Sequence, residues 1–140
     1  MPPENRERDI ARQWITRARS NLALAKGSKP AETLWEDLCF NLQQAAEKAV
    51  KAVLIFRGVE YPKTHDLRDL LSLLDPAAKT LDAEIWEAAD LNDYAVSTRY
   101  PGAFEPVTEE EYRRALEMAE MVVRWAAGVI GEGIRDSGER

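Results

Sequence analysis

Hydrophobic residues recur every three or four positions along most of the chain, the spacing of one face of an α-helix. A first helix is predicted to end at Gly27 and Pro30, and a second covers about 31–57 and ends at Gly58. The second segment carries two apolar stripes, so more than half of its circumference is hydrophobic. We therefore expect it to be the central helix, packed between several neighbours.

Three more helices are predicted in the rest of the chain. Thr64 can cap a short leucine-rich helix. Asp75 and Pro76 are typical of a helix start, and this fourth helix must end before the Tyr-Pro-Gly turn at 100–102. Thr108 with Glu111 three residues later predicts a capping box for the last helix. No segment shows the alternating pattern of a strand.

This pattern predicts an all-α fold, an antiparallel up-and-down four-helix bundle with one short extra helix. The 140 residues, 45% hydrophobic and 31% charged, suit a single domain over 1–140. We expect its core to span about 6–131, with a flexible tail at 132–140.

The charge and cysteine content narrow the classes of function. A net charge of −6 argues against a protein that coats DNA or a membrane through bulk positive charge. A local patch of basic residues is still compatible with this net charge. Cys39 has no cysteine partner and apolar neighbours, which indicates a buried thiol in a reducing compartment. No stretch is long and apolar enough for a signal peptide or a membrane span, so we expect a cytoplasmic protein with no membrane contact.

The common catalytic and metal-binding signatures are absent from the sequence. There is no glycine-rich phosphate loop, no H-E-x-x-H, no paired-cysteine knuckle and no G-x-S-x-G. One histidine and one cysteine argue against a zinc site of nitrogen and sulfur ligands. The acidic run 109–111 is explained as a favourable first helical turn. We expect no metal and no cofactor.

Three short sequence segments match a known pattern when they are taken together. They are Cys-Phe-Asn-Leu-Gln-Gln-Ala-Ala-Glu-Lys-Ala-Val-Lys-Ala at 39–52, Thr-His-Asp-Leu at 64–67 and Arg-Tyr-Pro at 99–101. In this order they resemble the HEPN family, small helical domains associated with nucleotide binding. The resemblance covers about residues 10–130.

Candidate binding residues lie in these segments or directly beside them. His65 follows a predicted cap, so it stands near a helix N-terminus whose N–H groups attract anions such as phosphate. Arg99 can hold phosphate as a fork, and Tyr100 can offer its ring or hydroxyl to a base. The six candidates for nucleotide binding are Lys63, His65, Arg99, Tyr100, and, as outer members, Gln44 and Lys48.

Each candidate also has a purely structural explanation. His65 can close its loop through a hydrogen bond, and Arg99 can bind the last carbonyls of a helix. Gln44 and Lys48 can simply face solvent while a neighbouring glutamate pairs with Lys51 one turn later.

The resemblance implies two kinds of function. Several HEPN proteins are metal-independent ribonucleases whose dimer joins two Arg-x(4–6)-His motifs. Here seven residues separate Arg57 from His65, and no histidine follows Arg99, so this spacing is absent. Other members are the helical partner of a separate minimal nucleotidyltransferase, and family members are commonly homodimers.

The favoured interpretation is a non-catalytic, nucleotide- or nucleic-acid-binding subunit of a two-component, toxin–antitoxin-like nucleotidyltransferase system. A ribonuclease toxin that uses Arg99 and His65 is the first alternative, and a dimeric scaffold without ligand is the second. The apolar surface supports a homodimer, with three of the four tryptophans as candidates for core or interface: Trp35, Trp86 and Trp125.

Overall fold

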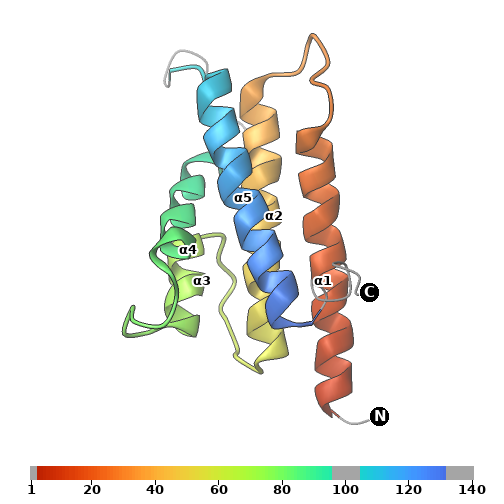
Figure 1. Cartoon of the computed structure of the whole chain (residues 1–140), viewed down its shortest axis with the longest axis vertical. Coiled ribbons are helices and arrows are strands. Elements are labelled where there is room, and N and C mark those ends of the chain that lie inside the picture. The colour runs from red at the N-terminus through yellow and green to blue at the C-terminus, as the bar shows by residue number, and fades with distance from the viewer. Residues whose placement is uncertain (1–2, 96–104, 132–140) are drawn as a thin grey trace.

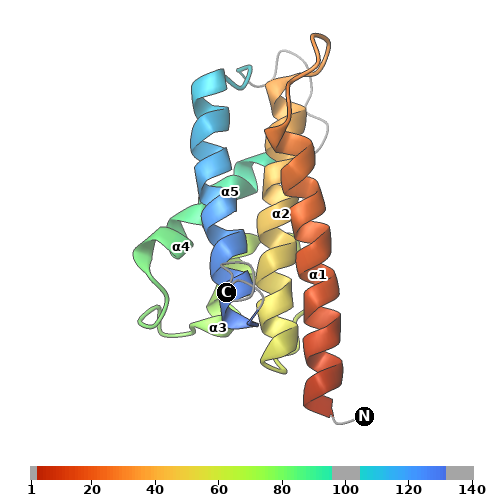
Figure 2. The same ribbon diagram turned by 45° about the vertical axis from the view of Figure 1, so that its right-hand side comes forward.

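Three long helices form the body of the molecule. The computed structural model describes residues 3–95 and 105–131, and over these residues it is helical with no strand, which confirms the predicted all-α class. Helix α1 (Pro3–Lys26) packs along α2 (Trp35–Phe56), and α5 (Glu109–Val129) packs on another side of α2 (Figures 1 and 2). Helices α1 and α2 run in opposite directions, whereas α5 runs the same way as α2.

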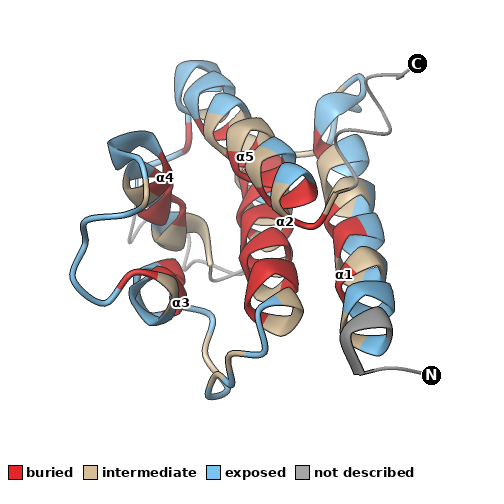
Figure 3. Ribbon diagram, turned by 60° about the horizontal axis from the view of Figure 1, so that its bottom comes forward, coloured by how far each residue is buried: buried red, intermediate tan, exposed pale blue. Residues whose placement is uncertain are grey.

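The central position predicted for α2 is confirmed. It contacts α1, α5, the short helix α3 (Leu67–Leu74) and the 3-10 helix η1 (Ala88–Tyr94), and most of its residues from Leu38 to Leu54 are buried (Figure 3). Alanines fill much of its contact surface, and small side chains allow neighbouring helix backbones to approach closely. The buried alanines of α2 are Ala45, Ala46, Ala49 and Ala52.

The buried face of α1 does not include its tryptophan. Ala11, Ile15 and Ala18 are buried, whereas Trp14 is half-buried and Ile10 is 37% exposed. Trp14 stays at the edge of the pair of helices α1 and α2, where its ring lies near the charged groups of Arg17 and Lys51.

The predicted ends of the long helices agree with the structure. Helix α1 ends at Lys26, before Gly27, and α2 ends at Phe56. Gly58 then has a φ of 70°, a left-handed conformation that glycine adopts without a steric penalty. Helix α5 begins at the predicted capping box, in which Thr108 and Glu111 each bind the other's backbone N–H.

The predicted fourth long helix does not form. The chain instead returns along α2 through α3, α4 (Ala83–Glu87) and η1, with turns between α3 and α4 (Figure 1). The reason lies in Asp75, which is buried and accepts hydrogen bonds from the backbone N–H groups of Lys79, Thr80 and Leu81. A carboxylate that gathers these amides stabilises a loop in place of the first helical turns.

The cysteine and three of the tryptophans lie in the core or against it. Cys39 is buried, as expected. The three tryptophans named for core or interface, Trp35, Trp86 and Trp125, are partly buried and pack against the core. The predicted tail at 132–140 lies outside the described residues. Within the described part of the chain, no helix has the length and hydrophobicity to cross a membrane.

Candidate functional site

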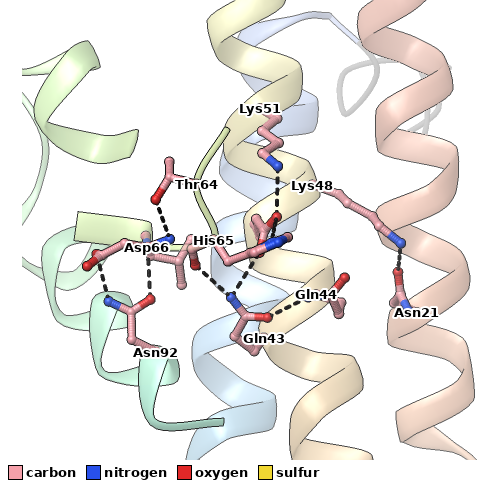
Figure 4. A network of polar contacts seen from close by, with 11 residues as sticks. Asn21, Gln43, Gln44, Lys48, Lys51, Thr64, His65, Asp66 and Asn92 are labelled. Carbon is pink, nitrogen blue, oxygen red and sulfur yellow. Dashed lines mark hydrogen bonds and ion pairs between the residues drawn. The ribbon is translucent and has the colours of Figure 1, made fainter. Parts of the chain in front are cut away.

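A buried carboxylate, Glu47, is the centre of a polar network on the side of α2 that faces the connection to α3 (Figure 4). Only 4% of its side chain is exposed. Its Oε1 accepts a hydrogen bond from Gln43 Nε2 at 3.1 Å. Its Oε2 accepts one from Lys51 Nζ at 2.8 Å and lies 3.0 Å from His65 Nδ1. Three donors from two segments therefore converge on one carboxylate.

Gln43 ties the connection to the central helix. Its amide is completely buried, and Nε2 donates to the backbone carbonyl of His65 at 3.2 Å as well as to Glu47. Its Oε1 accepts from Gln44 Nε2 at 2.8 Å. The amide of Gln43 is thus satisfied on both ends, and it fixes the backbone at His65 together with the orientation of Gln44.

The backbone after His65 is held as firmly. Asp66, and not Thr64, is the N-cap of α3, and its carboxylate accepts from the N–H groups of Arg68 and Asp69. The side chain of Asn92 in η1 accepts from Leu67 N at 2.8 Å and donates to Asp66 Oδ1 at 2.9 Å. The first-turn N–H groups at 67–69 therefore already have partners, so they do not form the anion site expected at this helix N-terminus.

The ring of His65 is fixed on one side and open on the other. Its side chain is 76% exposed, although Nδ1 meets the buried carboxylate. An ionised carboxylate only accepts hydrogen bonds, so the proton of a neutral ring lies on Nδ1 and the lone pair on Nε2. No described residue forms a hydrogen bond with Nε2.

The environment keeps Glu47 ionised. Burial alone raises the pKa of a carboxyl group, but the hydrogen bonds from Lys51, Gln43 and His65 outweigh burial and lower the pKa of Glu47 below its usual value of 4.5. A negative charge is therefore present beneath the imidazole at neutral pH.

Cations gather beside this network, on the seam between α1 and α2. The Lys51 ammonium lies 5.9 Å from the centre of the Trp14 ring and 5.6 Å from that of Tyr61. Lys48 Nζ donates to Asn21 Oδ1 on α1 at 2.7 Å. Burial, the charge of Arg17 and that of Lys51 lower the pKa of Lys48, an effect that Glu47 only partly opposes. Arg17 and Lys51 are thus close enough to Lys48 for their positive charges to disfavour its charged form.

Positive charge is concentrated in one stretch of the sequence despite the negative net charge of the chain. Residues 10–31 contain five lysines and arginines and no aspartate or glutamate, in a chain whose net charge is −6. Much of the acidic excess lies elsewhere, including the first turn of α5 and the segment 82–93. Lys26 pairs with Glu120 of α5, whereas Arg17 lies close enough to Lys48 for its charge to act on that lysine, so the basic spot at the α1–α2 seam consists of Arg17, Lys48 and Lys51.

The structure brings some of the predicted site residues together. Gln44, Lys48 and His65 all lie in or beside the network (Figure 4). Lys63 is exposed two residues before His65. Arg99 and Tyr100 fall outside the described residues, so their place relative to His65 stays a prediction.

Glu47 is the residue that sequence reasoning undervalued. Its pairing with Lys51 is confirmed, but the pair does not lie on a solvated face, because Glu47 is buried and Lys51 is only 12% exposed. One signal was available: Glu47 follows Ala45 and Ala46 on a helix expected to be buried over most of its circumference. A charge in such a position requires partners.

Other features of the surface do not add ligands to this site. Among the described residues, no three His, Cys, Asp or Glu side chains are grouped so that they could hold a metal ion. An open hollow between α4 and α5 is lined by Met118 and Met121 and by charged side chains. Another lies where α1 begins and α2 ends, around Glu7, Gly58 and Tyr61.

Comparisons with known proteins agree with this architecture. The family model for the HEPN domain matches residues 11–130. The structure of TT1696 from Thermus thermophilus is similar with a TM-score of 0.67 and 33% identity, covering 85% of this chain and 97% of that one. The structure of ST0689, an archaeal HEPN homologue, has a TM-score of 0.68 and 29% identity, covering 86% and 97% of the two chains. No curated protein matches the sequence. The chain belongs to the HEPN domain family.

Proposed function

We propose that this HEPN domain binds the phosphate groups of a nucleotide or a short RNA at the α1–α2 seam, beside His65. It does so as the non-catalytic helical subunit of a two-component system with a separate minimal nucleotidyltransferase. The observation that carries the binding proposal is the crowding of the charges of Arg17 and Lys51 on Lys48, next to the buried carboxylate that binds Lys51.

Crowded cations are poised for an anionic ligand. Lys48 is destabilised in its charged form by burial and by Arg17 and Lys51, so a bound phosphate would relieve that cost. Phosphate oxygens also form strong, charge-assisted hydrogen bonds with ammonium and guanidinium groups. The side-chain amide of Gln44, which is oriented by its hydrogen bond to Gln43, lies beside this network and can form hydrogen bonds with a base.

The size of the basic surface favours a small ligand. Long RNA binding depends on many phosphate contacts and on a broadly positive surface. The seam holds a few cations on a protein with a net charge of −6. A mononucleotide or a short oligonucleotide matches it better than a long duplex.

The test is calorimetric titration with mononucleotides and a short single-stranded RNA, comparing Arg17→Gln and Lys48→Gln with the parent protein. Each substitution removes one cation and should weaken binding by about 1 kcal/mol, roughly fivefold in Kd. Arg124→Gln, an exposed change of the same charge on α5, is the matched control and should leave Kd unchanged. Equal affinities for all four proteins, or no binding by the parent, would contradict the proposal.

The partner and the oligomeric state need their own measurement. We propose a homodimer that associates with the nucleotidyltransferase chain, by analogy with the family and because partly buried tryptophans such as Trp125 reach the surface. Native mass spectrometry of the protein gently isolated from its own host reports both. A monomer of 15.8 kDa without a second chain would count against this part of the proposal.

A second candidate function rests on one contact. A histidine whose Nδ1–H donates to a carboxylate presents Nε2 for proton transfer, as a metal-independent ribonuclease requires. In that case His65→Ala should abolish cleavage of RNA while folding and oligomeric state stay intact. Undiminished cleavage by this variant would eliminate the ribonuclease that uses His65 and Arg99.

A further inference from the structure

His65 is the sole histidine of the chain, and its ring has one bound nitrogen and one open nitrogen. Nδ1 lies 3.0 Å from Glu47 Oε2, whereas the side chain as a whole is 76% exposed. The backbone carbonyl of the same residue accepts from buried Gln43, and the next residue caps α3. The ring is therefore mounted on a rigid backbone with Nε2 accessible to a reagent.

We propose that Nε2 of His65 is a covalent acceptor of a phosphoryl group. An imidazole becomes an effective nucleophile when a neighbouring group fixes the tautomer with the lone pair outward and balances the charge that develops on the ring. Glu47 is placed for both tasks, because it accepts from Nδ1 with the same oxygen that holds Lys51. This goes beyond reversible nucleotide binding, since the product is a phosphorylated protein.

The neighbouring cations suit the incoming group. The Lys51 ammonium and the imidazole share one carboxylate oxygen, at 2.8 and 3.0 Å. Lys48 and Arg17 add positive charge on the same seam. A phosphoryl group carries negative charge on its oxygens throughout the transfer, and fixed positive charges stabilise that distribution.

The reaction requires a donor of the nucleoside triphosphate class or a smaller phosphoryl donor. The Nε2 lone pair forms the N–P bond as the bond from the terminal phosphorus to its bridging oxygen breaks. The electron pair of that bond leaves with the nucleoside diphosphate. The proton on Nδ1 stays in its hydrogen bond to Glu47, so the phosphorylated ring is cationic and the carboxylate balances it.

The experiment uses phosphoramidate, a small donor whose leaving group is ammonia, with the full-length protein. We expect one phosphoryl group per chain by intact mass, labile in acid, and located on Nε2 by phosphorus and proton–nitrogen NMR. The rate should exceed that of N-acetylhistidine under the same conditions by about tenfold. His65→Asn removes the sole histidine and should abolish the product.

The role of the carboxylate is tested by Glu47→Gln, which should lower the rate to that of free histidine. Glu117→Gln, an exposed change of the same charge on α5, is the matched control and should react like the parent. Circular dichroism at the reaction temperature checks that Glu47→Gln is folded, and the NMR assignment on the parent needs no variant at all. A product on Nδ1, or a parent rate no higher than that of N-acetylhistidine, overturns the proposal. So does an unchanged rate in folded Glu47→Gln.

This test is independent of the proposed nucleotide binding, because phosphoramidate is not a nucleotide. A protein that reacts with phosphoramidate but binds no nucleotide would support this inference and contradict the proposed function.

Discussion

Replacing Glu47 by glutamine tests the network at its centre, through the stability of the fold. The carboxylate accepts from Gln43, Lys51 and His65, whereas a glutamine amide has one acceptor oxygen and turns an N–H₂ group toward these donors. Hydrogen bonds to a charged group contribute about 1.5–3 kcal/mol each when buried. His65 is largely exposed and recovers hydration in the variant, whereas Lys51, only 12% exposed, recovers it in part. We therefore expect a net loss of about 2–3 kcal/mol.

The loss translates into a measurable shift of Tm. Unfolding entropy is about 2.1 cal/mol/K per residue, or about 0.3 kcal/mol/K for a chain of this length, so Tm should fall by about 7–10 °C. Urea denaturation and calorimetry at pH 7 measure both quantities. The exposed substitution Glu117→Gln is the control and should change Tm by little.

The pH dependence gives the same prediction a second, independent check. The pKa of Glu47 is lower in the folded protein than its usual value of 4.5. Its stabilising contribution is therefore complete above about 4.5 and decreases as the pH falls through the lower, folded pKa. The stability difference between the parent and Glu47→Gln should follow that decrease. Equal stabilities at pH 7, or a difference that does not shrink in acid, would show that the carboxylate does not hold these donors as described.

Two further substitutions test the elements on either side of the site. Thr108→Ala removes the N-cap of α5 and its reciprocal contact with Glu111, and should lower the free energy of unfolding by about 1 kcal/mol, or Tm by about 3 °C in a thermal melt. The control is Ser20→Ala, an exposed change within α1 that should leave Tm nearly unchanged. A similar loss of Tm in the control would contradict the capping explanation. Asp75→Asn should lower Tm at pH 7, because the amide cannot accept at two oxygens from three backbone N–H groups and from Trp86 Nε1. Burial raises the pKa of Asp75, but those backbone donors lower it well below its usual 3.8. The calorimetric difference in Tm between Asp75→Asn and the parent should therefore persist as the pH falls to about 3. A difference that disappears at a higher pH would contradict these hydrogen bonds to Asp75.

Local signals were sufficient for the long helices. A spacing of three to four residues, the glycines at 27 and 58 and the capping box at Thr108 all act within one or two turns, and the helices follow them. The segment after Asp75 shows the limit of such signals. Its apolar spacing is helical, but a buried carboxylate that collects three amides outweighs that spacing and leaves only α4 and η1.

For the candidate site, sequence reasoning named His65, Gln44 and Lys48, which lie in or beside the network, but it assigned the anion-attracting role to a helix N-terminus. The structure closes that N-terminus with Asp66 and Asn92, and it draws the positive charge from α1 and α2. Neither the closure by a residue of η1 nor the approach of Arg17 to Lys48 can be read from spacing, because each joins segments far apart in the chain.

By itself, the sequence determined the all-helical class, the central helix, the ends of α1 and α2, the start of α5 and the family, because each depends on the order of residues within short segments. Only the tertiary structure decided that Glu47 is a buried carboxylate holding Lys51 and the ring of His65. Glu47 stays ionised because hydrogen-bond donors from two segments of the chain converge on its carboxylate. A buried carboxyl group without such donors would be neutral, since burial disfavours the charged form.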